Sequence, residues 1–150
     1  MDNNFNFRMI TNSYEDFCNY SKLISQLTSQ FKLLEYSEYS TLIKNFKDII
    51  MLLEINKKVV GTIKIIFERK FYNNNCYVMH IEDVVVDEKY RGKGYGKMLI
   101  DYAIRLSEDN KDCYKIILNC SEEKKPFYEK CKFINENCGM SMRCSREDHK

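Results

Sequence analysis

The chain has 150 residues, with 24 Lys and Arg against 22 Asp and Glu, so its formal net charge is only +2. This length fits one compact domain, and the small charge gives no general attraction for a polyanion, which argues against a nucleic-acid partner. The longest apolar run, Ile49 to Leu53, is far too short to cross a bilayer, which argues against a transmembrane protein.

The 7 cysteines favour neither a disulfide framework nor a metal site. Polar residues follow Met1 where a secretory signal peptide would have an apolar core, so we expect reduced thiols in the cytoplasm. An odd number of cysteines cannot pair completely within one chain. Those from Cys113 to Cys144 never show the C-x-x-C spacing of a zinc knuckle, so no metal is expected.

Strand and helix signals alternate along the N-terminal part. Phe5 to Ile10 fits a short strand, and Ser13 followed by Asp16 resembles a capping box that opens a helix. A second helix is predicted from Glu38 to Phe46. The apolar face of the first helix is expected to repeat at Phe17, Tyr20, Ile24 and Leu27.

The middle of the chain reads as strands. Ile49 to Ile55 and Lys58 to Phe67 are apolar and β-branched runs separated by two polar residues, which predicts an antiparallel hairpin. Asn73 to Asn75 predicts a polar turn, and Tyr77 to Val86 the next strand. Asp87 to Gly94 then breaks the pattern.

The C-terminal part returns to helix and strand. Tyr95 to Ser107 is helical, with a core stripe at Leu99, Ala103 and Leu106. Tyr114 to Cys120 predicts a strand, Pro126 opens a short helix through Cys131, and Phe133 to Cys144 suggests a final hairpin-like pair. Together these elements predict one mixed α/β layered structure.

The turn from Arg91 to Lys97 carries the chemistry. An apolar strand leads through Gly92, Gly94 and Gly96 into a helix, so backbone N–H groups and the positive end of the helix dipole meet there. Arg91 and Lys93 add formal charge. A diphosphate group would be well placed at this turn.

Spacing separates the phosphate-binding loops that compete for this turn. A Walker A loop is excluded for two reasons. Gly92 lies too close to Gly96 to be the first Gly of that loop, and Met98 stands where the loop has a hydroxyl residue. The G-x-G-x-G run also fits the dinucleotide fingerprint poorly. The spacing does not exclude another interpretation, namely a solvated turn that only caps the helix. The pattern Arg91-x-x-Gly94-x-Gly96 resembles the loop by which GNAT acetyltransferases hold coenzyme A.

The neighbouring segments resemble glucosamine 6-phosphate N-acetyltransferases, in the same order and separation. They are His80 to Val86, Cys113 to Leu118 and Phe127 to Cys131, with Gln26 to Thr28, Glu68 to Lys70 and Met142 to Arg143 extending the similarity. The resemblance implies an α/β (α+β) GNAT fold, with a mixed, mostly antiparallel sheet flanked by helices, in one domain over residues 1–150. It also implies acetyl transfer from acetyl-CoA to the amine of glucosamine 6-phosphate, a step toward UDP-GlcNAc, in a homodimer without a metal.

Family roles carry over by position. Tyr128 would protonate the departing thiolate, because a phenol is protonated at neutral pH. Glu82 and Asp83 would orient the amine or receive its proton, although a regular strand points them to opposite faces unless a bulge intervenes. The residues implied in cofactor binding are Val84, Val85 and Val86 through their backbone, Arg91, Gly92, Lys93, Gly94, Tyr95, Gly96, Lys97, Tyr128 and Lys130.

The sugar phosphate needs its own donors. By position these are Thr28, Lys70 and Arg143, with Arg143 reaching the site of a partner subunit, and each of these residue types is more often a solvated surface residue. His80 is expected to pack in its strand rather than to catalyse.

The sequence departs from the family at two positions. Asn119 stands where the family has a carboxylate, and an amide cannot take a proton near neutral pH. Either Glu82, Asp83 or a water path would act in its place, or the enzyme would be slower, or its acceptor would differ. Lys132 stands where the family has Gly, which predicts an altered turn. Two alternatives therefore remain, namely an acetyltransferase for a protein amine or a polyamine, and a non-catalytic module that binds acetyl-CoA.

Overall fold

A computed structural model describes residues 4–136 and 139–142, and the chain falls into two compact units, residues 1–118 and 119–150. The first unit holds a five-stranded sheet in the order β1-β2-β3-β4-β5. Its strands are β1 (Phe5–Met9), β2 (Ile49–Ile55), β3 (Lys58–Arg69), β4 (Tyr77–Val86) and β5 (Cys113–Ile117). Successive strands pair antiparallel up to β4, whereas β4 and β5 pair parallel. The expected mixed, mostly antiparallel sheet is confirmed.

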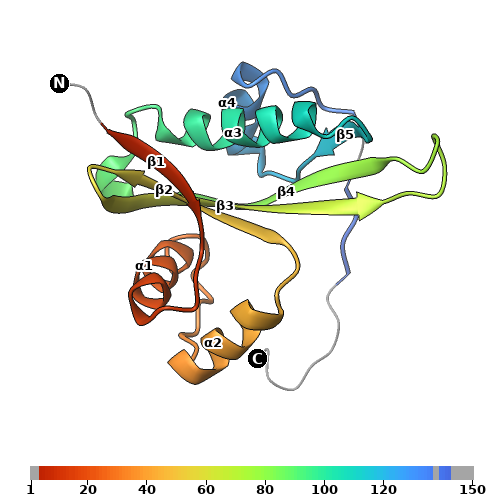
Figure 1. The fold of residues 1–150 in the computed structure, drawn as a ribbon. Helices are drawn as coiled ribbons and strands as arrows, with labels where there is room; N and C mark the ends of the chain where they lie inside the picture. The colour runs from red at the N-terminus through yellow and green to blue at the C-terminus, as the bar shows by residue number, and fades with distance from the viewer. Residues whose placement is uncertain (1–3, 137–138, 143–150) are drawn as a thin grey trace. The chain divides into compact units, whose positions relative to one another are not determined.

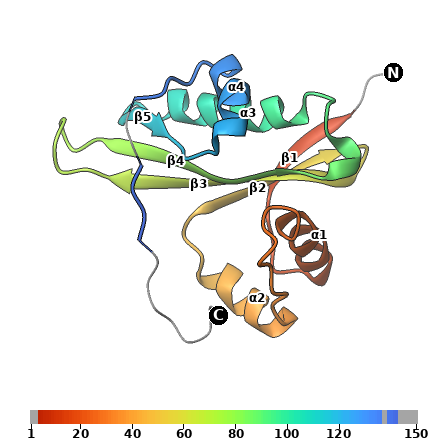
Figure 2. The same cartoon turned by 180° about the vertical axis from the view of Figure 1, so that it is seen from behind.

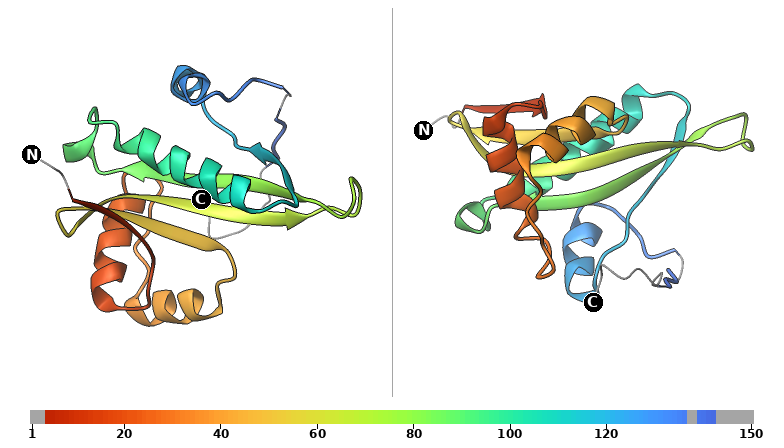
Figure 3. Two further views of the ribbon diagram at one scale, coloured as in Figure 1. Left: turned by 45° about the horizontal axis from the view of Figure 1, so that its top comes forward. Right: turned by 90° about the horizontal axis from the view of Figure 1, so that it is seen from below.

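Helices cover both faces of this sheet. Helices α1 (Tyr14–Ile24) and α2 (Tyr36–Asn45) lie on one face and α3 (Tyr95–Asp109) on the other (Figure 1 and Figure 3). Leu23 of α1 and Leu99 of α3 are 1% and 0% exposed, and each faces a sheet whose central residues, such as Ile63, are fully buried. The two helical layers and the strand alternation therefore build one core.

The β3–β4 hairpin extends past the rest of the first unit (Figure 2). Asn73, Asn74 and Asn75 at its tip have φ angles of 49°, 57° and 64°. Asn adopts this left-handed region more readily than most residues, which confirms the predicted polar turn.

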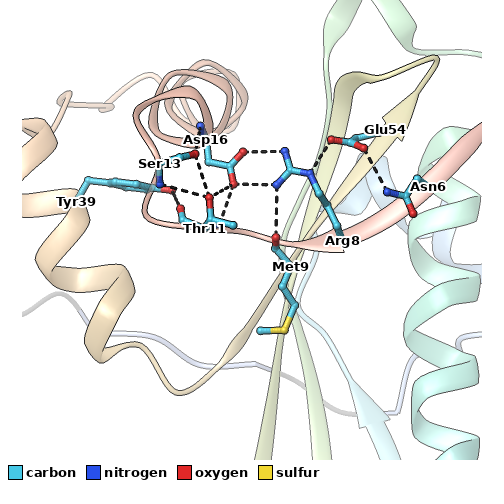
Figure 4. A network of polar contacts seen from close by, with 8 residues as sticks. All are labelled: Asn6, Arg8, Met9, Thr11, Ser13, Asp16, Tyr39 and Glu54. Carbon is cyan, nitrogen blue, oxygen red and sulfur yellow. Dashed lines mark hydrogen bonds and ion pairs between the residues drawn. The ribbon is translucent and has the colours of Figure 1, made fainter.

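A polar network anchors the N-terminal end of α1 (Figure 4). The Ser13 Oγ accepts the Asp16 backbone N–H at 3.2 Å, but the Asp16 carboxylate does not complete a capping box. It accepts two hydrogen bonds from Arg8, both 2.8 Å, and one from the Thr11 hydroxyl. Arg8 also donates to Glu54 of β2 at 2.6 Å, so the network joins β1, β2 and α1.

The carboxylate at the centre of this network is buried. Asp16 is only 1% exposed; burial would raise the pKa of its carboxyl, but the Arg8 and Thr11 hydrogen bonds outweigh burial and lower it. The Tyr39 hydroxyl of α2 donates to the Thr11 carbonyl at 2.7 Å. Both helices on this face are thus fixed to the same loop.

Several predicted details need correction. The apolar face of α1 ends at Leu23, whereas Leu27 lies past the helix and is 46% exposed. Helix α2 begins at Tyr36 because Glu35 and Glu38 form its capping box. Strand β5 ends at Ile117 rather than at Cys120, since its ladder with β4 ends there.

The second unit contains a single helical turn (Glu122–Lys124) followed by α4 (Lys125–Lys130), with Pro126 in its first turn as predicted. Helix α4 ends in a Schellman motif: the Phe133 N–H donates to the Tyr128 carbonyl at 3.1 Å and the Lys132 N–H to the Glu129 carbonyl at 2.9 Å. Lys132 has a φ of 69°. Lys132 thus occupies a left-handed position that favours glycine.

The predicted pair of strands from Phe133 to Cys144 is wrong for the described part, because residues 133–136 and 139–142 contain no strand. Met140 and Met142 are 97% and 88% exposed. In the described residues of both units, no helix is long and apolar enough to span a bilayer.

Candidate active site

A bulge interrupts β4 near its C-terminal end. Lys64 of β3 pairs with Glu82 and Thr62 pairs with Val85, so that Ile63 alone lies opposite both Asp83 and Val84. Asp83 has a φ of 48°, which is unusual for a residue other than glycine. The bulge removes the strict alternation that would send Glu82 and Asp83 to opposite faces.

The same part of β4 has an open edge on its β5 side. The ladder between the two strands runs only from Tyr77 to His80, where His80 pairs with Ile117. Among the described residues, no strand pairs with residues 81–86 on that side. Backbone N–H and C=O groups at a bare strand edge are ready to bond an extended ligand.

The turn after β4 presents glycines in a conformation that other residues avoid. Gly92 and Gly94 have φ angles of 76° and 84°, and a Cβ atom built on either would meet no protein atom within 4 Å. The space beside the turn is therefore open to a ligand. The residues present fit a diphosphate, since their small size lets it approach the backbone.

Helix α3 begins directly at this turn. Its first hydrogen bond runs from the Met98 N–H to the Gly94 carbonyl at 3.1 Å, so the N–H groups of Tyr95, Gly96 and Lys97 have no partner within the helix. These amides and the dipole of this 15-residue helix favour an anion at its N-terminal end.

The basic side chains of the turn differ in their contacts. The Arg91 Nε donates to the Val86 carbonyl at 3.0 Å, which bends the exposed guanidinium back over the end of β4. Lys93 lies 5.3 Å from the Tyr90 ring centroid, and Lys97 pairs with Asp101 at 2.5 Å. Arg91 is thus the cation most directly fixed beside the open edge.

The predicted acid pair lies at the bulge, and α1 approaches it. Burial raises the pKa of Tyr20 on α1 to about 12, and the negative charge of Asp83 adds to this effect. Glu82 is partly buried opposite Lys64. Both carboxylates therefore belong to one region at the end of β4.

The two described candidates for phosphate binding lie on separate segments. Lys70, just beyond β3, forms an ion pair with Glu68, and Glu68 also contacts the His80 Nε2 at 2.7 Å. The Lys70 pair lowers the pKa of Glu68. Thr28, past the end of α1, accepts the Gln30 N–H at 3.2 Å. Lys70 would exchange Glu68 for a phosphate on binding.

The remaining candidates belong to the second unit. Asn119 is its first residue, and Tyr128 lies in α4, with its ring centroid 5.0 Å from that of Phe127 and 6.1 Å from that of Phe133. Lys130 is the last residue of α4. Arg143 lies outside the described residues.

Sequence reasoning missed two residues beside the turn. Asp87, the first residue after β4, is 1% exposed, and Lys22 of α1 donates to its Oδ2 at 2.5 Å. An acidic residue directly before a turn is a common N-cap and was the available signal. The sequence offered no signal for Lys22 as its partner.

Residues 9–133 match the model of the Acetyltransferase (GNAT) family. The chain is 36% identical over 128 residues to glucosamine 6-phosphate N-acetyltransferase 1 of Dictyostelium discoideum, covering 82% of this chain and 81% of the relative. It is 42% identical over 88 residues to the Arabidopsis thaliana glucosamine 6-phosphate N-acetyltransferase, covering 59% of this chain and 58% of the relative.

Two solved structures match over a larger part of the chain than these two relatives do. The crystal structure of glucosamine-6-phosphate N-acetyltransferase from Arabidopsis thaliana matches with a TM-score of 0.84 and 31% identity, over 95% of this chain and 99% of that one. A Trypanosoma brucei acetyltransferase matches with a TM-score of 0.79 and 30% identity, over 94% of this chain and 100% of that one.

Proposed function

Because the chain belongs to the GNAT acetyltransferase family, we propose that it transfers the acetyl group of acetyl-CoA to the amine of glucosamine 6-phosphate. The observation that carries this proposal is the open edge and bulge of β4, followed at once by the positive-φ glycine turn and the start of α3. The names of the relatives support the choice of acceptor.

Acetyl-CoA supplies the activated thioester, and the chain supplies the surface that holds it. The amides at the start of α3 and the cations of residues 91–97 would bind the diphosphate, with Gly92 and Gly94 allowing close approach. The bare edge of β4 would hold the extended pantetheine arm by backbone hydrogen bonds. The Val84–Val86 backbone would then face the thioester carbonyl.

Catalysis in this proposal is positioning and charge stabilisation without an acetylated residue. Backbone N–H groups at the β4 bulge would stabilise the negative charge that develops on the carbonyl oxygen. Glu82 or Asp83 would accept the amine proton directly or through water, because Asn119 cannot. Tyr128 would donate its proton to the thiolate of coenzyme A.

The sugar phosphate would be held by Lys70 and Thr28, and Arg143 would contribute from a partner subunit of a homodimer. The ion pair with Glu68 raises the pKa of Lys70 and so keeps its ammonium charged before the sugar binds. We also propose that residues 1–150 act as one catalytic domain in the cytoplasm, and that no metal takes part. The family match supports the single domain, because residues 9–133 cross the boundary between the two units.

The test is release of free coenzyme A thiol from acetyl-CoA, measured with glucosamine 6-phosphate, glucosamine, a polyamine and a lysine-containing peptide. We expect turnover with the sugar phosphate to exceed that with each other amine. Lys70→Ala should raise the KM for glucosamine 6-phosphate about tenfold or more, since a charge-assisted contact to the phosphate is lost. Lys111→Ala, at an exposed lysine before β5, serves as the matched control.

Equal rates with glucosamine and its 6-phosphate would overturn the phosphate site. Preferred turnover of the peptide or the polyamine would assign a different acceptor to the same cofactor site. Binding of acetyl-CoA without thiol release on any amine would make the chain a binding module instead.

A further inference from the structure

Asp87 occupies an unusually constrained position between β4 and the glycine turn. Its side chain is 2% exposed, and its backbone N–H donates to the Val60 carbonyl of β3 at 2.9 Å. Its Oδ1 accepts the Lys89 N–H at 3.0 Å and its carbonyl accepts the Tyr90 N–H at 2.8 Å. Asp87 therefore caps the short 3₁₀ helix Glu88–Tyr90 that leads into the turn.

Two side chains at the C-terminal end of α1 reach the same point, Lys22 in its last turn and Gln26 just past its end. The Lys22 Nζ donates to the Asp87 Oδ2 at 2.5 Å, and the Gln26 Oε1 accepts the Glu88 N–H at 2.8 Å. Gln26 also donates to the Lys22 carbonyl at 3.2 Å, which holds the two side chains side by side, one helical turn apart. Asp87 and Glu88, which lead into the glycine turn, are thus bonded to Lys22 and Gln26 respectively.

These contacts join two parts that the proposed reaction must align. Residues 88–94 lead to the amides proposed for the diphosphate, whereas α1 leads directly into the segment that contains Thr28, on the proposed acceptor side. A turn with two positive-φ glycines has much conformational freedom, so its amides converge on one anion only if something holds its ends. Arg91 bonds the end of β4 itself, so the ties from this segment to the end of α1 are those made by the Asp87 carboxylate and the Glu88 N–H.

We propose that Asp87 is a positioning residue whose ion pair with Lys22, together with the hydrogen bond from the Glu88 N–H to Gln26, fixes the diphosphate-binding turn against the end of α1 and so sets the affinity for acetyl-CoA. This rests on the proposed binding of acetyl-CoA at residues 91–97. Asp87 touches neither substrate in this account, and it acts through the backbone of Glu88 to Tyr90. The buried carboxylate keeps its charge because the Lys22 and Lys89 hydrogen bonds lower its pKa against the effect of burial.

The experiment measures the Kd for acetyl-CoA by calorimetry and the kinetic constants for the wild type, Asp87→Asn, Lys22→Met and Gln26→Leu. We expect Asp87→Asn to raise both the Kd and the KM for acetyl-CoA about tenfold or more, since a shift of the binding amides by about 1 Å is costly. The KM for glucosamine 6-phosphate should change much less. Lys22→Arg should retain most of the affinity, because it keeps a donor for the Asp87 Oδ2.

Asp16→Asn is the matched control. Asp16 is also 1% exposed and ion-paired. It lies in the first turn of α1, at the end opposite to the one where Lys22 contacts Asp87. Asp16→Asn should lower the melting temperature as Asp87→Asn does, but leave the Kd for acetyl-CoA unchanged. A purely structural Asp87 would make the two variants alike in both measurements, which would overturn the proposal.

The outcomes separate the two claims. If the wild type does not bind acetyl-CoA, the proposed function fails; if it binds and the variants bind equally well, only the positioning role fails. Should Asp87→Asn not fold, Lys22→Met decides, since the Lys22 side chain is 58% exposed and its loss leaves the helix intact. An unchanged Kd in Lys22→Met together with Gln26→Leu would then overturn the positioning role.

Discussion

Substitutions at Gly94 separate two properties of the turn, namely its left-handed backbone conformation and the space beside it for a ligand. Its φ of 84° lies in the left-handed region, and no protein atom lies within 4 Å of the Cβ that a larger residue would bring. A substitution at this position therefore meets no steric clash in the free protein. The cost to folding comes from the backbone alone.

We expect Gly94→Ala to reduce the free energy of unfolding by about 1–2 kcal/mol, the penalty of a left-handed residue with a Cβ. Gly94→Asn should cost less, because Asn tolerates this region. The order of stability is thus Gly, Asn, Ala. Urea unfolding followed by circular dichroism measures it.

Binding of acetyl-CoA should follow a different order. If the open space beside Gly94 receives the diphosphate, the larger Asn side chain obstructs it more than the methyl group of Ala. The order of affinity is then Gly, Ala, Asn. If the affinities of the two variants for acetyl-CoA follow the same order as their stabilities, the reasoning is refuted, because backbone strain alone would explain both measurements. Affinity equal to that of the wild type in Gly94→Asn would show that the ligand does not approach here.

Three further substitutions have defined outcomes. Lys132→Gly should raise the free energy of unfolding by about 1 kcal/mol, because Lys132 has a φ of 69° and glycine removes the backbone strain of that conformation. Urea unfolding measures this, and an unchanged midpoint would show that Lys132 is not strained. Asp16→Asn should lower stability by about 3 kcal/mol at neutral pH by breaking a buried ion pair. Because folding lowers the Asp16 pKa below its ordinary 3.8, this difference should shrink as the pH falls below that value, and a pH-independent difference in melting temperature would refute the pairing. Asn119→Asp should raise kcat about tenfold by restoring a proton acceptor, and an unchanged kcat would place that role on Glu82, Asp83 or water.

Two central strands and the glycine turn were predictable from local sequence. β2 and β4 have the predicted bounds, Ile49–Ile55 and Tyr77–Val86, because β-branched runs bounded by polar turns have few other structures to adopt. Gly92 and Gly94 adopt a positive φ, which glycine reaches more readily than other residues, in keeping with the predicted glycine-rich turn. Membership of the GNAT family and the class of fold were recognised from such local segments.

The parts that failed depend on contacts between distant segments. Asp16 seemed to be a capping partner for Ser13, but Arg8 lies on the neighbouring strand and takes its carboxylate. The bulge that turns Asp83 to a φ of 48° arises from pairing with β3, which no local pattern records. The Asp87–Lys22 pair spans 65 residues of sequence and has no periodic signature.

The central claim is that residues 91–97 bind the diphosphate of acetyl-CoA. Calorimetric titration of the folded protein with acetyl-CoA, and in parallel with acetyl-pantetheine, which lacks the diphosphate, tests it most directly. We expect saturable binding of acetyl-CoA and a loss of most of that affinity with acetyl-pantetheine. Equal affinity for both ligands, or no heat from either, would contradict the account.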